Sequence, residues 1–129
     1  MAGDREAILA ANDRFYRAFE KKDLEAMTAA WSKGINSLCI HPGRKALKGW
    51  EAIGTSWEQI FKNTRYLEID TDIISIESSG DLAYVVLIET ILQVGSGRRL
   101  EAQSMATNIF ERMGGQWYLV HHHGSPIVS

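Results

Sequence analysis

Residues 82–94, LAYVVLIETILQV, form an almost unbroken apolar and β-branched run. This composition is typical of a β-strand, and turn sequences bound it on both sides, Ser79-Gly80-Asp81 before it and Gly95-Ser96-Gly97 after it. A strand with one face in water alternates apolar and polar side chains, whereas this one barely alternates. We therefore expect both of its faces to be covered, one by helices of the same chain and the other by a second subunit in a homodimer packed through the sheet face.

Three more segments have strand character. Residues 66–78 alternate apolar and polar side chains, and residues 100–113 and 116–124 flank the two-residue loop Gly114-Gly115. Two glycines in such a loop are a strong hairpin signal, because a type I′ turn requires positive φ at both positions. Together with the apolar run, these segments predict a sheet of antiparallel hairpins in the second half of the chain.

The first half of the chain has the 3.6-residue periodicity of helices. Apolar and aromatic residues recur on one face over roughly residues 4–21, and Asp23 is a plausible N-cap for a second, short helix. A third helix is expected after Gly49, because large apolar side chains repeat there at helical spacing. These side chains are Trp50, Ile53, Trp57, Ile60 and Phe61.

Helices followed by hairpins are the pattern of the α+β class, in which the helices stack on one face of a sheet. Between the second and third helices, two very short extended pieces are expected, hinged at Pro42-Gly43. The sequence contains no linker, repeat or low-complexity segment. It therefore predicts one domain over residues 1–129.

Composition excludes several partners and compartments. A net charge of −2 gives no electrostatic basis for binding nucleic acid or an anionic membrane, and no apolar stretch is long enough to span a bilayer. The first residues carry charges where a signal peptide would be apolar. Cys39 is the only cysteine, so an internal disulfide is excluded. These features predict a cytoplasmic protein.

Three of the four histidines are consecutive, at His121, His122 and His123. Side chains alternate along a strand, so His121 and His123 share a face with Trp117 and Leu119 while His122 faces the other way. We expect the Trp117 side to face inward; the opposite register would place His122 inside and the pair on the dimer face. Two ligands fall short of a usual zinc site, so no metal or other cofactor is expected.

Glu89 is a carboxylate inside the apolar run. Burial of a carboxyl group is unfavourable for its charged form, so Glu89 needs a partner or a raised pKa. One interpretation is a general acid or base in a desolvated cavity, with His121 or His123 as its partner. The other is a structural ion pair or a contact at a subunit interface.

An interior pocket is the second functional hypothesis. Aromatic side chains from separate helices could surround it, and a few polar groups could orient a ligand within it. Aromatic residues at helical spacing are also ordinary core residues. The expected lining consists of Tyr16, Trp31, His41, Trp57, Asn108, His121 and His123.

The segments KKDLEAMTAAW, CIHPG, GWEAIGTSWEQIF and QWYLVHHHGS resemble those of the nuclear-transport-factor-2-like superfamily, especially SnoaL-like and DUF4440-type bacterial proteins. Residues 101–125 also resemble the association domain of calcium/calmodulin-dependent protein kinase II. The matching positions are Ala102-Gln103-Ser104, Thr107, Trp117, and the Val-His-x-His pattern at Val120, His121 and His123. The resemblance implies a cone-shaped, strongly curved antiparallel sheet, with three N-terminal helices packed over its concave face and a deep pocket at its open end.

The resemblance also bears on the site and the activity. It implies that His121 or His123 lies at the pocket wall, and that Trp31, His41 and Trp57 are pocket or rim residues. The superfamily includes isomerases, cyclases, dehydratases and epoxide hydrolases, and neither a tyrosine with paired aspartates nor an Asp-Arg-Asp set occurs here. The kinase association domain has pocket arginines, where this chain has the apolar Val86.

Three hypotheses for function remain. The chain could bind a small molecule that is aromatic or apolar with one polar or carboxylate end. Alternatively, it could be a cofactor-free isomerase, dehydratase or hydrolase in which Glu89 or His123 moves a proton and Asn108 or Tyr16 stabilises an oxyanion. A dimeric scaffold with an incidental cavity is the third hypothesis.

Overall fold

The computed structural model describes residues 2–95 and 97–128, and it contains the three expected helices. They are α1 (Ala2–Lys21), α2 (Leu24–Ala30) and α3 (Trp50–Asn63). Asp23 caps α2 as predicted, because its Oδ1 accepts a hydrogen bond from the backbone N–H of Ala26 at 3.0 Å. The helical periodicity of the first half is therefore confirmed.

The strands also follow the predicted segments. They are β1 (Leu38–Ile40), β2 (Leu47–Lys48), β3 (Tyr66–Ser79), β4 (Leu82–Gly95), β5 (Arg98–Met113) and β6 (Gln116–Pro126). Gly114 and Gly115 have φ values of 57° and 79°, as the type I′ hairpin requires. Ser96, in the predicted turn after β4, lies outside the described residues.

The six strands form one sheet in the order β2-β1-β6-β5-β4-β3. The hairpins β3–β4, β4–β5 and β5–β6 are antiparallel as expected, but β1 pairs with β6 in parallel. The sheet is therefore mixed rather than wholly antiparallel. Parallel pairing requires a long connection, and here α3 and four strands separate β1 from β6.

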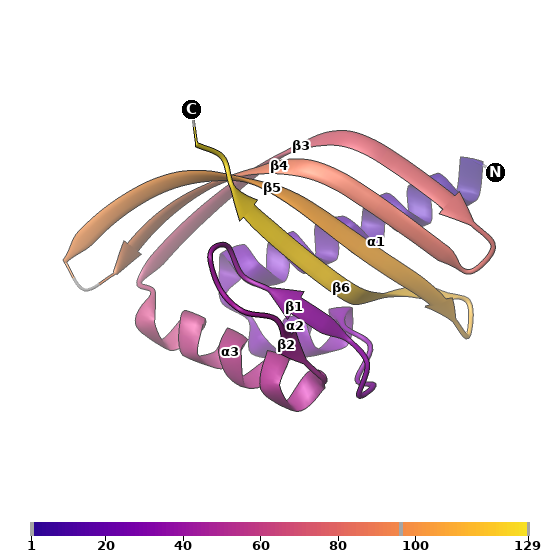
Figure 1. Cartoon of the computed structure of the whole chain (residues 1–129), viewed down its shortest axis with the longest axis horizontal. Helices are drawn as coiled ribbons and strands as arrows, with labels where there is room; N and C mark the ends of the chain where they lie inside the picture. The colour runs from indigo at the N-terminus through magenta and orange to yellow at the C-terminus, as the bar shows by residue number, and fades with distance from the viewer. Residues whose placement is uncertain (1, 96, 129) are drawn as a thin grey trace.

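The sheet arches strongly, and the three helices lie on its concave side (Figure 1). The inward side chains of the sheet and helices form one apolar core, which includes Phe15, Trp57, Val85 and Leu87. Register shifts interrupt the β3–β4 and β5–β6 ladders, and such β-bulges bend a strand and increase its twist. None of the described helices is long and apolar enough to cross a membrane.

The bulge in the β5–β6 ladder decides which way the histidines face. Leu119 pairs with Phe110 and His121 pairs with Ile109, so Val120 is an extra residue in β6. Simple alternation from Trp117 therefore ends at Leu119. Beyond the bulge, His122 is buried inside, whereas His121 is half-buried and His123 is exposed. The expectation that His121 and His123 lie on the inner face is wrong.

Candidate functional site

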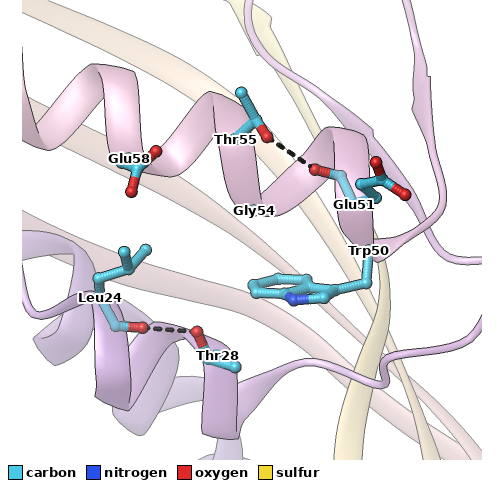
Figure 2. A pocket seen from close by; sticks show the side chains of 7 residues that line it. All are labelled: Leu24, Thr28, Trp50, Glu51, Gly54, Thr55 and Glu58. Carbon is cyan, nitrogen blue, oxygen red and sulfur yellow. Dashed lines mark hydrogen bonds between the residues drawn. The ribbon is translucent and has the colours of Figure 1, made fainter.

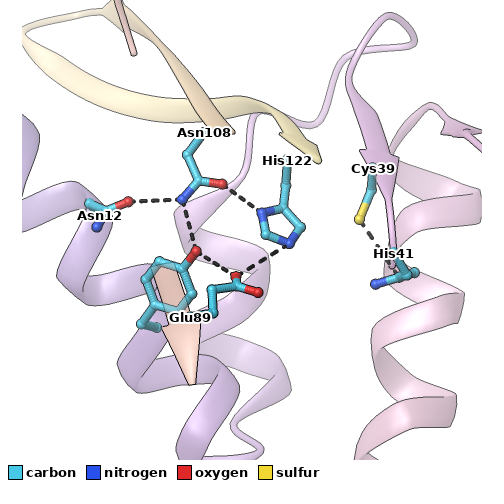
Figure 3. A network of polar contacts seen from close by, with 7 residues as sticks. Asn12, Cys39, His41, Glu89, Asn108 and His122 are labelled. Carbon is cyan, nitrogen blue, oxygen red and sulfur yellow. Dashed lines mark hydrogen bonds and ion pairs between the residues drawn. The ribbon is translucent and has the colours of Figure 1, made fainter. Parts of the chain in front are cut away.

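Five polar side chains meet inside the concave face of the sheet (Figure 3). They converge from four elements that are far apart in sequence, and each is at most 3% exposed. We call them the inner polar network. Its members are Asn12 and Tyr16 from α1, Glu89 from β4, Asn108 from β5 and His122 from β6.

Asn108 sets the direction of the hydrogen bonds in this network. Its Nδ2 amide donates to Asn12 Oδ1 at 2.9 Å and to the Tyr16 hydroxyl at 3.1 Å, which uses both amide hydrogens. Its Oδ1 therefore accepts from Nδ1 of His122 at 2.5 Å, which assigns the imidazole proton to Nδ1. The other imidazole nitrogen, Nε2, is left with a lone pair.

That lone pair faces Glu89. His122 Nε2 lies 3.8 Å from Glu89 Oε2, and the Tyr16 hydroxyl donates to the same oxygen at 2.6 Å. Burial raises the pKa of the Tyr16 phenol well above its usual value, so Tyr16 stays protonated and remains a donor. The partner of Glu89 is thus His122, not His121 or His123 as the sequence predicts.

Burial also decides the charge states of Glu89 and His122. Desolvation raises the pKa of Glu89 to about 7, although the hydrogen bond from Tyr16 lowers it in part. Desolvation, with smaller contributions from the other histidines, lowers the pKa of His122 to about 3. Between these values both groups are neutral, so their contact is not an ion pair. A carboxyl group with a pKa near 7 can take up or release a proton near neutral pH.

A second polar cluster lies beside the network, and Trp57 packs near both. His41 Nε2 is 3.0 Å from Ser56 Oγ and 3.6 Å from Cys39 Sγ. The Trp57 ring packs edge-on against His41 at 5.0 Å between centroids and lies 6.3 Å from the His122 ring. Burial lowers the pKa of His41 and raises that of the Cys39 thiol, so both groups are neutral at pH 7.

Trp31 and Trp57 are completely buried and pack against Phe15, so they belong to the core. Among the described residues, neither indole Nε1–H has a hydrogen-bond acceptor. A buried donor without a partner loses its hydrogen bond to water and gains none in return. The two indoles are therefore groups that an acceptor placed in the interior would satisfy.

Two hollows open among the helices, away from the inner polar network. One, of about 250 Å³, lies between α2 and α3, and Trp50 lies across it (Figure 2). The other, of about 300 Å³, lies along α1 and α2. None of the predicted pocket residues lines either hollow, so an interior pocket stays a prediction.

The structure brings part of the predicted site together. Tyr16 hydrogen-bonds to both Glu89 and Asn108, whereas His121 and His123 lie on the outer face of the sheet. The sequence placed His122 inside only in the alternative register, which is the one that the structure has, and it gave no role to Asn12. Asn12 carried a signal, because it is a polar residue on the apolar face of the first helix.

Comparison with known proteins identifies the family. A sequence profile described as SnoaL-like domain matches residues 8–129. The chain belongs to the SnoaL-like family. This SnoaL-like chain is also 28% identical over 122 residues to F-box protein SKIP8 of Arabidopsis thaliana. The aligned segment is 95% of this chain, and this chain spans only 50% of the length of that relative.

Solved structures agree with this assignment. A proposed dehydratase of the NTF2-like family from Streptomyces avermitilis is 29% identical, with a TM-score of 0.93 and coverage of 100% of both chains. A proposed calcium/calmodulin-dependent protein kinase type II association domain from Thiobacillus denitrificans is 28% identical, with a TM-score of 0.83 and coverage of 92% of this chain and 94% of that one. The resemblance and the cone fold inferred from sequence are confirmed.

Proposed function

We propose that this SnoaL-like chain binds a small molecule against the inner polar network. The observation that carries the proposal is a carboxyl group, Glu89, which is 1% exposed among apolar core residues and hydrogen-bonded to the Tyr16 hydroxyl. Tyr16 and Glu89 offer hydrogen bonds to the polar end of a ligand, and the surrounding aromatic rings suit an apolar or aromatic body. Ionised Glu89 would repel a carboxylate, so a carbonyl or hydroxyl end fits best.

The segment between β1 and β2 is the proposed entrance. A Cβ atom placed at Gly124 would lie 3.0 Å from Pro42 Cγ and 3.8 Å from Glu89 Oε1. Gly124 therefore lies against the carboxyl group on the side of Oε1, and Pro42 packs on Gly124, while Tyr16 and His122 contact Oε2. Residues 42–46 are exposed, so displacement of this loop would open a path to Oε1.

A second candidate function is cofactor-free acid–base catalysis by an isomerase, dehydratase or hydrolase. The pKa of Glu89 favours it, because a general acid or base works best when its pKa is near the working pH. Glu89 would move the proton, and Tyr16 or Asn108 would stabilise an oxyanion that displaces one of their present hydrogen-bond acceptors. His123 faces away from the interior, and His122 lies beside Glu89 instead. The pKa of His122, about 3, keeps its ring neutral near pH 7, so Glu89 is the acid–base group of this candidate. The proposed dehydratase from Streptomyces avermitilis is consistent with this candidate.

One set of variants tests both candidates. Ligand-observed NMR with aromatic ketones and phenols should detect fragments that bind the wild type and bind at least tenfold more weakly to Y16F and E89Q. The variant E101Q, at an exposed position on β5, should bind like the wild type. Binding that E89Q and Y16F leave unchanged would contradict the proposed site.

Turnover separates an enzyme from a binding protein. Carbonyl, epoxide and lactone compounds that bind should be assayed for conversion by the wild type and E89Q. Catalysis predicts conversion that E89Q abolishes while some binding remains. If the wild type binds these compounds but does not convert them, the enzyme candidate fails and the binding function stands.

We also propose that two copies pair through the outer face of the sheet. Six uncharged side chains lie side by side there in cross-strand pairs, and two of them, Tyr84 and Met105, are 42% and 36% exposed. We call them the outer apolar patch: Tyr84, Val86 and Ile88 of β4, and Met105, Thr107 and Ile109 of β5. A face of this kind is typical of a subunit interface. A single domain over residues 1–129 and a cytoplasmic location stay predictions.

A further inference from the structure

We propose that His121 and His123 are the chain's half of a binding site for a divalent transition-metal ion, which the same pair from a second copy completes. This inference rests on the proposed pairing through the outer face of the sheet. Both imidazoles project from that face of β6, and their ring centroids are 6.2 Å apart. The inner polar network does not use either histidine.

The spacing of the pair suits chelation. Nitrogen–metal bonds of about 2.0–2.1 Å with tetrahedral angles place two imidazole centroids roughly 5 Å apart. The observed separation exceeds this by about 1 Å, which rotation about the side-chain bonds can close. His123 is exposed and His121 is half-buried, so the rings can turn without disturbing the core.

The neighbouring side chains neither compete for the metal nor repel it. In register beside His121 are Leu38 and Ile109, and beside His123 are Ile40 and Thr107. None of these four carries charge. Imidazole is a preferred ligand of Zn²⁺, Cu²⁺ and Ni²⁺, and a site with nitrogen ligands selects these ions over Mg²⁺ and Ca²⁺.

One chain alone offers too few ligands for a closed zinc site. Within residues 2–95 and 97–128, no group of three or more histidine, cysteine, aspartate or glutamate side chains could hold a metal ion. A closed zinc site has four ligands. The histidine pair borders the outer apolar patch, because His123 pairs with Thr107 and His121 with Ile109. Two copies related by a twofold axis near the pair would therefore supply four imidazoles.

The test uses tag-free protein and Zn²⁺ as the probe. Isothermal titration calorimetry at pH 7.5 should give one Zn²⁺ per two chains, and H121A/H123A should weaken binding at least 100-fold. H41Q removes a histidine from the inner side and should bind Zn²⁺ like the wild type. Circular dichroism checks folding, and H121N/H123N serves as a second double variant with the same expected loss.

Light scattering with Zn²⁺ and with EDTA separates the metal site from the dimer. A dimer that loses Zn²⁺ binding in the double variants supports the proposal. Undetectable Zn²⁺ binding, one Zn²⁺ per chain, or binding that the double variants retain overturns the metal site. If the wild type binds no Zn²⁺ but is still a dimer in EDTA, only the metal site is overturned. A wild-type monomer that binds no Zn²⁺ overturns both the metal site and the dimer.

Discussion

Glu89 is the residue whose environment departs most from what its charge requires. The sequence identified it, because a lone carboxylate in a run of apolar strand residues has few explanations. Its partner could not be identified, since the choice among three consecutive histidines depends on a single inserted residue. The structure selects His122 and adds Tyr16 and Asn108, so that every polar group around Glu89 comes from a different strand or from α1.

The first prediction concerns the pH dependence of stability. The pKa of Glu89 is raised in the folded state to about 7 from 4.5. Its contribution to the free energy of unfolding is therefore fully present below pH 4.5 and is lost as the pH rises through 7. Glutamine does not titrate. The free energy of unfolding of E89Q should therefore rise by on the order of 3 kcal/mol relative to that of the wild type between pH 4.5 and pH 8. Urea unfolding at several pH values measures this difference.

The lowered pKa of His122 acts in the opposite direction, since its contribution is present above pH 6.5 and is lost as the pH falls toward 3. It is common to both proteins and cancels in the comparison with E89Q. The exposed substitution E101Q should show no pH-dependent gain. A stability difference between E89Q and the wild type that stays constant with pH would contradict the buried state of Glu89.

At the scale of elements, the sequence predicted nearly every helix and strand. Glycine-containing turns bound the long strands, and helical periodicity covers α1 and α3, so local signals sufficed. Two features had no such signal. The parallel pairing of β1 with β6 joins segments far apart in the sequence, so it depends on the tertiary fold. The bulge at Val120 is not marked by a glycine or another special residue. A bulge of this kind accepts ordinary residues.

The bulge leads to a prediction about the three histidines of β6. H122A removes a completely buried ring and leaves Asn108 Oδ1 without its donor, so it should destabilise the fold by about 3 kcal/mol. H121A and H123A remove rings from the outer face and should each cost less than about 1 kcal/mol. Chemical unfolding of the three variants checks the order. If H123A is the most destabilising variant, the result would contradict the bulge at Val120, which places His122 inside and His123 outside.

At the scale of the whole molecule, the unbroken hydrophobicity of β4 has a structural counterpart in the outer apolar patch. Light scattering should give about 29 kDa, twice the 14.5 kDa of one chain. I88D places a carboxylate in the patch and should shift the protein to the monomer, because an unpaired charge at a buried interface is unfavourable. L100D, at an exposed position outside the patch, should remain a dimer. A wild-type monomer at micromolar concentration would contradict the dimer.

The central claim is that Glu89 is a buried, proton-exchanging carboxyl group at the ligand site. The most direct test is an NMR titration of its side-chain carboxyl carbon in the wild type and in Y16F. The wild type should titrate with a midpoint near pH 7, and Y16F should titrate higher, because the hydrogen bond from Tyr16 favours the ionised form. A midpoint near 4.5 that Y16F leaves unchanged would contradict the claim.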